Sequence, residues 1–254
     1  MTGGGCMGDT RLDGWSGEEL ATVLDLPCVK VLDETTSTLD VAHKLGADGA
    51  KSGTLVIADR QTAGRGRGGN KWTSPAGSGL WITIIERPVD ASGMDVLSLR
   101  VGLLAARALD RFSADPVRLK WPNDLYVDGR KLGGILIEAR WQEGRLEWVA
   151  VGVGVNVLEP IHVAGGTGLE AGTRRVDVLV DLIPAVRTAA SYRGALGSDE
   201  LAEWSSRDMA RGHGCSEPAR GTVMGISASG ELLVAIADSV ARFRSGSLVL
   251  DQVR

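Results

Sequence analysis

The chain is poor in the residues that most often mark a metal site or a disulfide framework. Its 254 residues include only three cysteines and three histidines. The cysteines lie far apart and match no metal-ligand or disulfide spacing, so we expect no disulfide and a reducing, cytoplasmic environment. The histidines are isolated in the sequence, so we expect none of them to be a catalyst or a metal ligand. These residues are Cys6, Cys28, Cys215, His43, His162 and His213.

Other absences argue against membrane, secretion and nucleic-acid functions. No uncharged apolar run reaches the roughly 18 to 20 residues that span a bilayer, and residues 1–10 are glycine-rich rather than apolar. The net charge of -4 argues against a general DNA or membrane binder. The hydrophobic fraction of 43% is ample for a substantial core. We therefore expect a soluble, cytoplasmic protein that binds neither nucleic acid nor membrane.

Hydrophobic periodicity predicts a mixed α/β body. The clearest helix covers 96–112, where Leu99, Leu103, Ala106 and Leu109 recur at helical intervals. Further helices are expected at 18–24, 37–45, 176–190 and 199–209. Strands are expected at 29–32, 55–59, 80–85, 117–120, 126–127, 131–138 and 148–157. A glycine-rich stretch, 160–172, is expected to be a mobile loop.

The C-terminal part of the chain changes character. Short strands separated by turns are expected at 221–226, 231–237 and 240–244, a pattern typical of a small β-barrel. Glycine and proline cluster near 211–218, which is typical of a domain boundary. We therefore divide the chain into a tail with a short helix (1–28), a main α/β domain (29–212) and a β module (213–254).

The first segment with chemical character is 61–72, Gln-Thr-Ala-Gly-Arg-Gly-Arg-Gly-Gly-Asn-Lys-Trp. Its glycines let the backbone approach a ligand, and Arg65, Arg67 and Lys71 add positive charge suited to phosphate or carboxylate. It is not a P-loop, because no Gly-Lys-Ser/Thr follows four spacer residues. An RNA-binding Arg-Gly segment is the alternative, although the motif occurs once and lacks interleaved aromatic residues.

The segment 120–124, Lys-Trp-Pro-Asn-Asp, places an amide and a carboxylate on a rigid turn at the end of a strand. Asn123 and Asp124 either orient a ligand or bond to the neighbouring backbone, and the residues alone leave both interpretations open.

Two strands carry glycines in their interior. Glycine within a strand indicates close approach of a ligand or of another backbone, or a simple kink in the sheet. Gly133 and Gly134 follow Lys131, and 151–157 reads Val-Gly-Val-Gly-Val-Asn-Val. Asn156 in the second strand offers both a donor and an acceptor, as a nucleobase edge requires.

Taken in order, these segments resemble the signature of the biotin–protein ligases. The matching stretches are 61–67 with Trp72, 120–124, 131–136 and 152–156, preceded by Glu-Thr-Thr-Ser-Thr at 34–38. The resemblance extends from about residue 29 to the end, because 221–226 and 244–246 are similar to the family's SH3-like module. It implies a mixed sheet with helices, related to the class II aminoacyl-tRNA synthetases, followed by a small SH3-like β-barrel.

The resemblance also implies a two-step, ATP-binding ligase. The biotin carboxylate attacks the α-phosphate of ATP, normally with Mg²⁺, giving biotinyl-5′-adenylate and pyrophosphate. A lysine of a biotin carboxyl carrier domain then attacks the activated carbonyl, so the product is a biotinylated protein and AMP. Only about 28 residues precede the first core strand, too few for the DNA-binding domain of some members. Monomer and homodimer both stay open.

The family's biotin contacts fall on residues that surround the head group, the ring and the carboxylate. They are Ser37, Thr38, Gln61, Arg65, Gly66, Arg67, Lys131, Gly133 and Gly134. Among them, Gly133 and Gly134 are expected to form a floor under the flat bicycle.

The contacts implied for ATP and the adenylate are Arg65, Arg67, Trp72, Lys131 and Asn156. Trp72 is expected to stack on adenine and Asn156 to bind its edge. The catalytic assignments are Arg67 and Lys131 as charge stabilisers and Asp124 as the group that orients or deprotonates the incoming amine. No metal ligand is assigned.

The sequence departs from the family at three positions. Leu39 stands where asparagine is usual, and Gly68 and Asn70 stand where arginine is common. The loop 161–172 is expected to close over the adenylate and exclude water. A lipoate or octanoate ligase, an RNA-binding module and a biotin sensor without turnover are the competing hypotheses.

Overall fold

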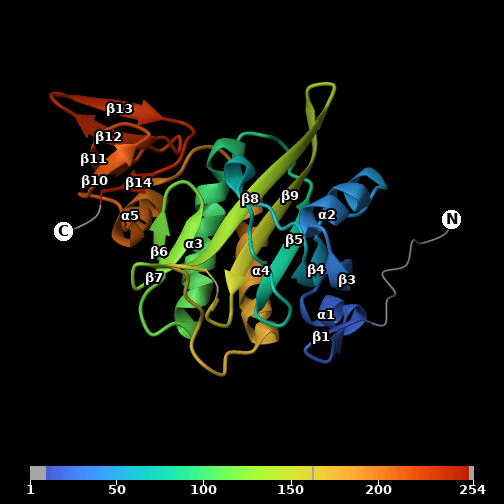
Figure 1. Cartoon of the computed structure of the whole chain (residues 1–254). Helices are drawn as coiled ribbons and strands as arrows, with labels where there is room; N and C mark the ends of the chain where they lie inside the picture. Colours follow the sequence, from blue (N-terminus) through green and yellow to red (C-terminus); the bar gives the residue numbers. More distant parts are fainter. Residues whose placement is uncertain (1–9, 162, 252–254) are drawn as a thin grey trace.

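A seven-stranded mixed sheet forms the centre of the computed structural model, which describes residues 10–161 and 163–251 (Figure 1). The strand order is β3-β4-β5-β9-β8-β7-β6, in which β3 and β4 are parallel and the other neighbours antiparallel. The strands are β3 (Cys28–Thr35), β4 (Thr54–Gln61), β5 (Gly79–Glu86), β6 (Arg118–Lys120), β7 (Asp124–Val127), β8 (Arg130–Gln142) and β9 (Arg145–Asn156). All seven predicted strands of the body are confirmed, and β8 and β9 form a longer hairpin than the pattern indicated.

Helices cover both faces of this sheet. They are α1 (Gly17–Val23), α2 (Thr38–Ala47), α3 (Leu97–Leu109), α4 (Arg175–Ser191) and α5 (Ser198–Arg207), with 3-10 turns at Arg67–Gly69, Met94–Val96 and Asp110–Phe112. The helices α3 and α4 pack against one face and α2 against the other. The predicted mixed α/β body is therefore confirmed.

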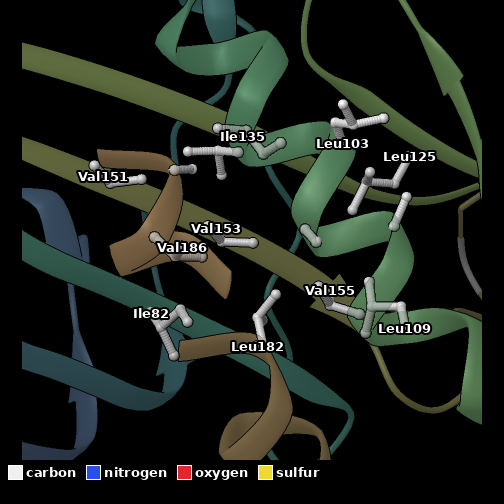
Figure 2. Packing of buried hydrophobic residues seen from close by; sticks show 14 of the residues in the cluster. Ile82, Leu103, Leu109, Leu125, Ile135, Val151, Val153, Val155, Leu182 and Val186 are labelled. Atoms are coloured by element: carbon white, nitrogen blue, oxygen red, sulfur yellow. The ribbon is translucent and has the colours of Figure 1, made fainter. Parts of the chain in front are cut away.

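The main core lies between the sheet and the pair α3 and α4. In β9, Val151, Val153 and Val155 point to this side and are buried against leucines of both helices, as Figure 2 shows. Successive side chains of a strand point to opposite faces, so the residues between these valines face the other side. That alternation gives β9 one face of valines, whereas the opposite face lacks side chains at Gly152 and Gly154.

A smaller core lies under α2. Leu39 and Ala42 of this helix pack with Ile85 of β5 and with Trp148 and Ala150 of β9. Ser37 caps the helix, because its side chain accepts a hydrogen bond from the backbone of Leu39. This second core fixes α2 beside the cavity described below.

The C-terminal module is a five-stranded antiparallel sheet with the order β13-β12-β11-β10-β14. Its strands are β10 (Gly214–Glu217), β11 (Gly221–Ile226), β12 (Leu232–Ile236), β13 (Ser239–Phe243) and β14 (Val249–Leu250). The three predicted strands are confirmed as β11, β12 and β13. The short strands β10 and β14 were not predicted, because β10 lies in the segment interpreted as a domain boundary. The division of the chain into domains stays a prediction.

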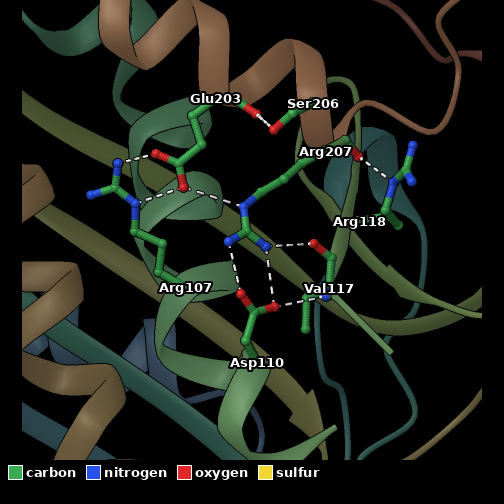
Figure 3. Close-up of polar contacts among 7 residues, drawn as sticks. All are labelled: Arg107, Asp110, Val117, Arg118, Glu203, Ser206 and Arg207. Carbon is green, nitrogen blue, oxygen red and sulfur yellow. Dashed lines mark hydrogen bonds and ion pairs between the residues drawn. The ribbon is translucent and has the colours of Figure 1, made fainter. Parts of the chain in front are cut away.

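Ion pairs tie α5 to the end of α3 (Figure 3). Arg207 Nη2 lies 2.7 Å from Asp110 Oδ2, and its Nη1 donates to the carbonyl of Val117 at 3.0 Å. Arg107 and Glu203 form a second pair one turn away. Because β6 begins directly after Val117, this network fixes the start of the strand that leads into the site.

The outcomes for the N-terminal part and the cysteines differ from expectation. Residues 1–9, which include Cys6, and His162 lie outside the described residues. A short hairpin of β1 (Arg11–Leu12) and β2 (Trp15–Ser16) was not predicted in the tail.

Cys28 is disulfide-bonded, so the expectation of no disulfide is wrong, whereas Cys215 is a buried free thiol. None of the helices in the described part has the length and apolarity needed to cross a membrane.

The core between β9 and α4 predicts a large effect of Leu182→Ala. Leu182 is fully buried, whereas Val180 on the same helix is 37% exposed. Removing the buried side chain leaves a cavity, so the free energy of unfolding should fall by about 2–5 kcal/mol. Urea denaturation measures this change. Val180→Ala serves as the control and should change the stability by less than about 0.5 kcal/mol; equal effects of the two variants would contradict this account of the core.

Candidate functional site

A cavity of about 400 Å³ lies on the α2 side of the sheet. Its walls are the start of α2, the glycine-rich loop (residues 64–71), the turn 121–123 and residues 246–248 of the C-terminal module. Its base is formed by β8 and β9. Five separate parts of the chain therefore meet around one space.

The base of the cavity is built from glycine. Gly134 of β8 pairs with Gly154 of β9, and the indole of Trp72 lies over them. A Cβ on Gly154 would lie 2.7 Å from Trp72 Nε1, whereas one on Gly134 would lie 3.4 Å from Trp72 Cζ3. A Cβ on Gly133 would lie 2.7 Å from the carbonyl oxygen of Gly154 and 3.3 Å from the side chain of Leu125, and Gly133 does not line the cavity. Gly134 and Gly154 thus form the part of the floor under Trp72, and Gly152 also lines the cavity.

Trp72 is held between an aromatic ring and a cation. Its ring meets that of Trp81 edge-on at 6.3 Å, and Lys131 Nζ lies 5.3 Å from its centroid. The indole N–H is buried and has no hydrogen-bond partner among the described residues. A buried donor without a partner costs free energy. A position in which the indole N–H of Trp72 forms a hydrogen bond would therefore be more favourable for this group.

One end of the cavity is strongly cationic. Of the lining residues that the structure describes, five carry a positive charge and only Asp124 carries a negative one. Lys131 Nζ lies 2.8 Å from Asp124 Oδ1. The five cations are Arg65, Arg67, Lys71, Lys120 and Lys131. An excess of fixed positive charge over one carboxylate is an environment for polyanions.

Burial tunes the groups at this end. It lowers the pKa of Lys120, and the nearby Lys131 lowers it further while Asp124 opposes the shift. It also lowers the pKa of Arg67, again against the influence of Asp124. The pKa of Tyr126, whose ring lies 5.7 Å from Lys120 Nζ, is raised to about 12 by burial and by Asp124. Tyr126 is therefore neutral at ordinary pH.

The other end of the cavity is polar but uncharged. Gln61 Oε1 accepts hydrogen bonds from the backbone N–H of Thr38 at 2.8 Å and from its hydroxyl at 3.2 Å. Thr83 donates to the same hydroxyl at 2.8 Å, and Gln61 Nε2 donates to Ser74 at 2.8 Å. This network holds donors and acceptors in fixed positions, as recognition of a neutral polar group requires.

The turn 121–123 resolves the two interpretations of the Lys-Trp-Pro-Asn-Asp segment. Asn123 bonds to backbone: its Nδ2 donates to the carbonyl of Ile135 at 2.7 Å, and its own carbonyl accepts from the N–H of Ile135. Asp124 instead faces the cavity and pairs with Lys131. The amide thus has a structural role, whereas the carboxylate is available to a ligand.

Asn156 lies outside the cavity lining. Its Nδ2 donates to the carbonyl of Thr167 at 3.1 Å and, more weakly, to that of Lys131 at 3.4 Å. Lys131 also donates its N–H to Gly165 at 2.7 Å. Asn156 therefore fastens part of the loop 161–172 to the start of β8, beside the charged end of the cavity.

The structure brings together ten of the twelve residues singled out in the sequence. They are Ser37, Thr38, Gln61, Arg65, Gly66, Arg67, Trp72, Asp124, Lys131 and Gly134. Gly133 and Asn156 are the two that do not line the cavity, and the roles assigned to all twelve stay predictions.

Sequence reasoning missed several lining residues. Lys120 belongs to a segment that was singled out, but it received no role. Trp81, Gly154 and residues 246–248 also line the cavity. The run Arg244-Ser-Gly246 was the available signal for the C-terminal contribution, although nothing in it indicated proximity to this site.

Comparison with known proteins gives a consistent result. Residues 29–156 match the model of the biotin/lipoate A/B protein ligase family. The bifunctional ligase/repressor BirA of Bacillus subtilis is 38% identical over 126 residues, covering 49% of this chain and 39% of that protein. The biotin--[acetyl-CoA-carboxylase] ligase of Paracoccus denitrificans is 35% identical over 153 residues, covering 54% of this chain and 63% of that protein.

A solved structure extends the similarity over most of the chain. The biotin protein ligase of Aquifex aeolicus in complex with biotin and ATP superposes with a TM-score of 0.70 and 25% identity, covering 89% of this chain and 99% of that one. The chain spans about two fifths of the length of the first curated relatives that it matches.

The glycine floor predicts different effects of two similar substitutions. Gly154→Ala should displace the indole of Trp72, because the new Cβ would lie within 3 Å of it, whereas Gly134→Ala creates only ordinary contact. The indole N–H resonance of Trp72, assigned by comparison with Trp72→Phe, reports the difference in a ¹H–¹⁵N spectrum. It should move toward a solvent-exposed position in Gly154→Ala and stay in place in Gly134→Ala. The same spectrum for both variants would contradict the proposed packing.

Proposed function

The chain belongs to the biotin/lipoate A/B protein ligase family, and on this premise we propose that it is a biotin–protein ligase. It would convert biotin and ATP to biotinyl-5′-adenylate and pyrophosphate, then transfer biotin to a lysine of a biotin carboxyl carrier domain. The observation that carries the proposal is the cavity itself, which joins a polar uncharged end, a glycine floor and a cationic end with one carboxylate. Biotin and ATP together present the matching groups.

The polar end suits the head group of biotin. Ser37, Thr38 and Gln61 offer hydroxyl and amide groups to a ureido ring, and Thr38 and Gln61 can exchange their mutual hydrogen bonds for bonds to it. Gly134 and Gly154 leave room for a flat bicycle. Leu39, which replaces the family's usual asparagine, adds an apolar wall at this end.

The cationic end suits the first chemical step. The biotin carboxylate attacks the α-phosphorus, the bond from the α-phosphorus to the bridging oxygen breaks, and pyrophosphate leaves with the electron pair. Negative charge gathers around the α-phosphate during this step. Arg67 and Lys131 are positioned to stabilise it, and such donors typically contribute a few kcal/mol each. Trp72, now over the floor, would move aside and stack on adenine.

The second step needs a group that handles the proton of the acceptor amine. The lysine nitrogen attacks the carbonyl carbon, the bond from that carbon to the phosphate oxygen breaks, and AMP leaves. Asp124 is the carboxylate that lines the cavity, and it lies 2.8 Å from Lys131. We assign it to orient the amine and accept its proton. The loop that Asn156 fastens would cover the adenylate and keep water away from it.

Magnesium fits this site as part of the nucleotide substrate. Among the described residues, no group of three or more histidine, cysteine or acidic side chains could hold a metal ion. Mg²⁺ is commonly held by substrate phosphates with one or two carboxylates, and it would neutralise phosphate charge. Asp124 is the side chain that could contact it. The proposal therefore places Mg²⁺ with ATP rather than in a protein cage.

Biotin-dependent exchange of labelled pyrophosphate into ATP tests the first step. The wild-type protein should catalyse exchange, and Lys131→Ala should reduce it by at least about a hundredfold, because a preorganised donor to the α-phosphate is lost. Lys44→Ala removes an exposed lysine of α2 away from the cavity and should leave the rate unchanged. Exchange that depends on lipoate or octanoate instead of biotin would favour the other branch of the family, and no exchange with any of them would refute the proposal.

Asp124→Asn tests the second step separately. Asparagine keeps the shape of the side chain but cannot accept a proton from the amine. Pyrophosphate exchange should stay within about threefold of the wild type, whereas transfer of biotin to a carrier domain should fall by about 10²–10⁴-fold. Single-turnover transfer from preformed adenylate, followed by mass spectrometry, measures this step. Equal losses in exchange and transfer would show that Asp124 does not act specifically on the amine.

A further inference from the structure

The tip of the glycine-rich loop is attached to the body through a single side chain. Arg65 Nη2 lies 2.9 Å from Asp40 Oδ1 of α2 and 3.2 Å from Glu138 Oε2 of β8. The other hydrogen bonds described for residues 65–70 stay within the loop, such as that from the N–H of Gly66 to the carbonyl of Asn70 at 2.7 Å. Within the part of the chain that the structure describes, Arg65 alone forms ion pairs from the loop tip to two elements of the fold.

Glu138 is itself held in place by a half-buried neighbour, His43. His43 Nε2 lies 2.8 Å from Glu138 Oε2, and Trp148 Nε1 donates to His43 Nδ1 at 3.2 Å. An indole N–H can only donate, so Nδ1 accepts and the ring proton lies on Nε2, which donates to the carboxylate. Trp148 is only 7% exposed and packs under α2. A continuous series of hydrogen bonds and ion pairs therefore runs from the core through His43 and Glu138 to Arg65.

This series of contacts leaves part of the Arg65 guanidinium available to a ligand. Both ion pairs use Nη2, and among the described contacts neither Nε nor Nη1 of Arg65 donates a hydrogen bond. Arginine has five N–H donors in a rigid fork, so fixing one nitrogen fixes the direction of the others. Arg65 lines the cavity at the same time.

We propose that Glu138, oriented by His43, and Asp40 are positioning residues that hold the glycine-rich loop closed over the cavity through Arg65. The proposal rests on the biotin ligase function, in which Arg65 binds the biotin carboxylate. A loop that is closed only part of the time binds its ligand more weakly in proportion to the closed fraction. The two acids therefore act on biotin binding, although neither is assigned a contact with biotin.

The expected effect is on KM for biotin rather than on kcat. Glu138→Gln, Glu138→Asp and Asp40→Asn should each raise KM in the exchange assay by about three- to tenfold, with kcat within about twofold. Once biotin is bound, Lys131 and Arg67 are unchanged, so only binding is lost. Limited trypsin digestion without ligand should cleave the loop severalfold faster in each variant, with the cut sites identified by mass spectrometry.

Glu138→Asp separates position from charge. It keeps the negative charge but shortens the side chain by one methylene, so the contact with Arg65 is lost. If Glu138 only competed with the biotin carboxylate for Arg65, Glu138→Gln would lower KM and Glu138→Asp would not raise it. Either result would overturn the proposal.

Matched controls test whether the effect passes through Arg65. Glu34→Gln removes a carboxylate from the exposed pair with Arg60, where the atoms lie 2.9 Å apart, and should alter neither KM nor loop cleavage. In an Arg65→Ala background, Glu138→Gln should cause no further rise in KM, because coupled residues are not additive. Additive effects would overturn the proposal.

The ligase function and the positioning role of Glu138 and Asp40 are separately testable. If the wild-type protein shows no biotin-dependent exchange, the ligase function fails, yet trypsin digestion still tests the anchoring of the loop. If exchange is normal and neither KM nor cleavage changes in the three variants, only the positioning role fails. Asp40 is half-exposed on the first turn of α2, so Asp40→Asn tests the role even if a Glu138 variant folds poorly.

Discussion

The register of β9 between β5 and β8 is the constraint on which both the core and the cavity depend. Its valines point to α3 and α4, whereas Gly152 and Gly154 point to the cavity. A shift of one residue would exchange the two faces, placing valine side chains in the cavity and glycines in the core. The fully buried valines therefore stabilise the fold and, by the same register, keep the floor free of side chains.

The cations at the charged end of the cavity lie on elements that are fixed by contacts elsewhere in the fold. Lys120 ends β6, whose start is fixed by the network of Arg207, and Lys131 is the second residue of β8. Arg67 comes from the loop that Arg65 ties to the body. These like charges lie in partly buried positions, and Asp124 is the one carboxylate among the described lining residues that opposes their repulsion. A carboxylate or phosphate that binds here relieves that repulsion, so the excess positive charge itself favours anionic ligands.

Much of the fold was predictable because each main element carries a local pattern. Period-2 runs and helical spacing identified the strands and helices of the body, and glycine-rich runs identified the segments around the cavity. Sequence could not tell which of Gly133 and Gly134 faces the cavity, because that depends on register with Leu125 and Gly154. Likewise, His43 looked isolated because its partners Glu138 and Trp148 are about a hundred residues away. Contacts distant in sequence leave no local signal.

The boundary between the main body and the C-terminal module is not a boundary of the site. Trp121 Nε1 donates to the carbonyl of Gly230 at 3.0 Å, which joins the module to the turn that presents Asp124. A Cβ on Gly230 would lie 3.0 Å from Leu99, so the module packs closely on α3. Residues 246–248 then complete the cavity wall. One buried hydrogen bond connects the module to the turn 121–123. The contacts that fold the module onto the body therefore also place residues 246–248 at the cavity.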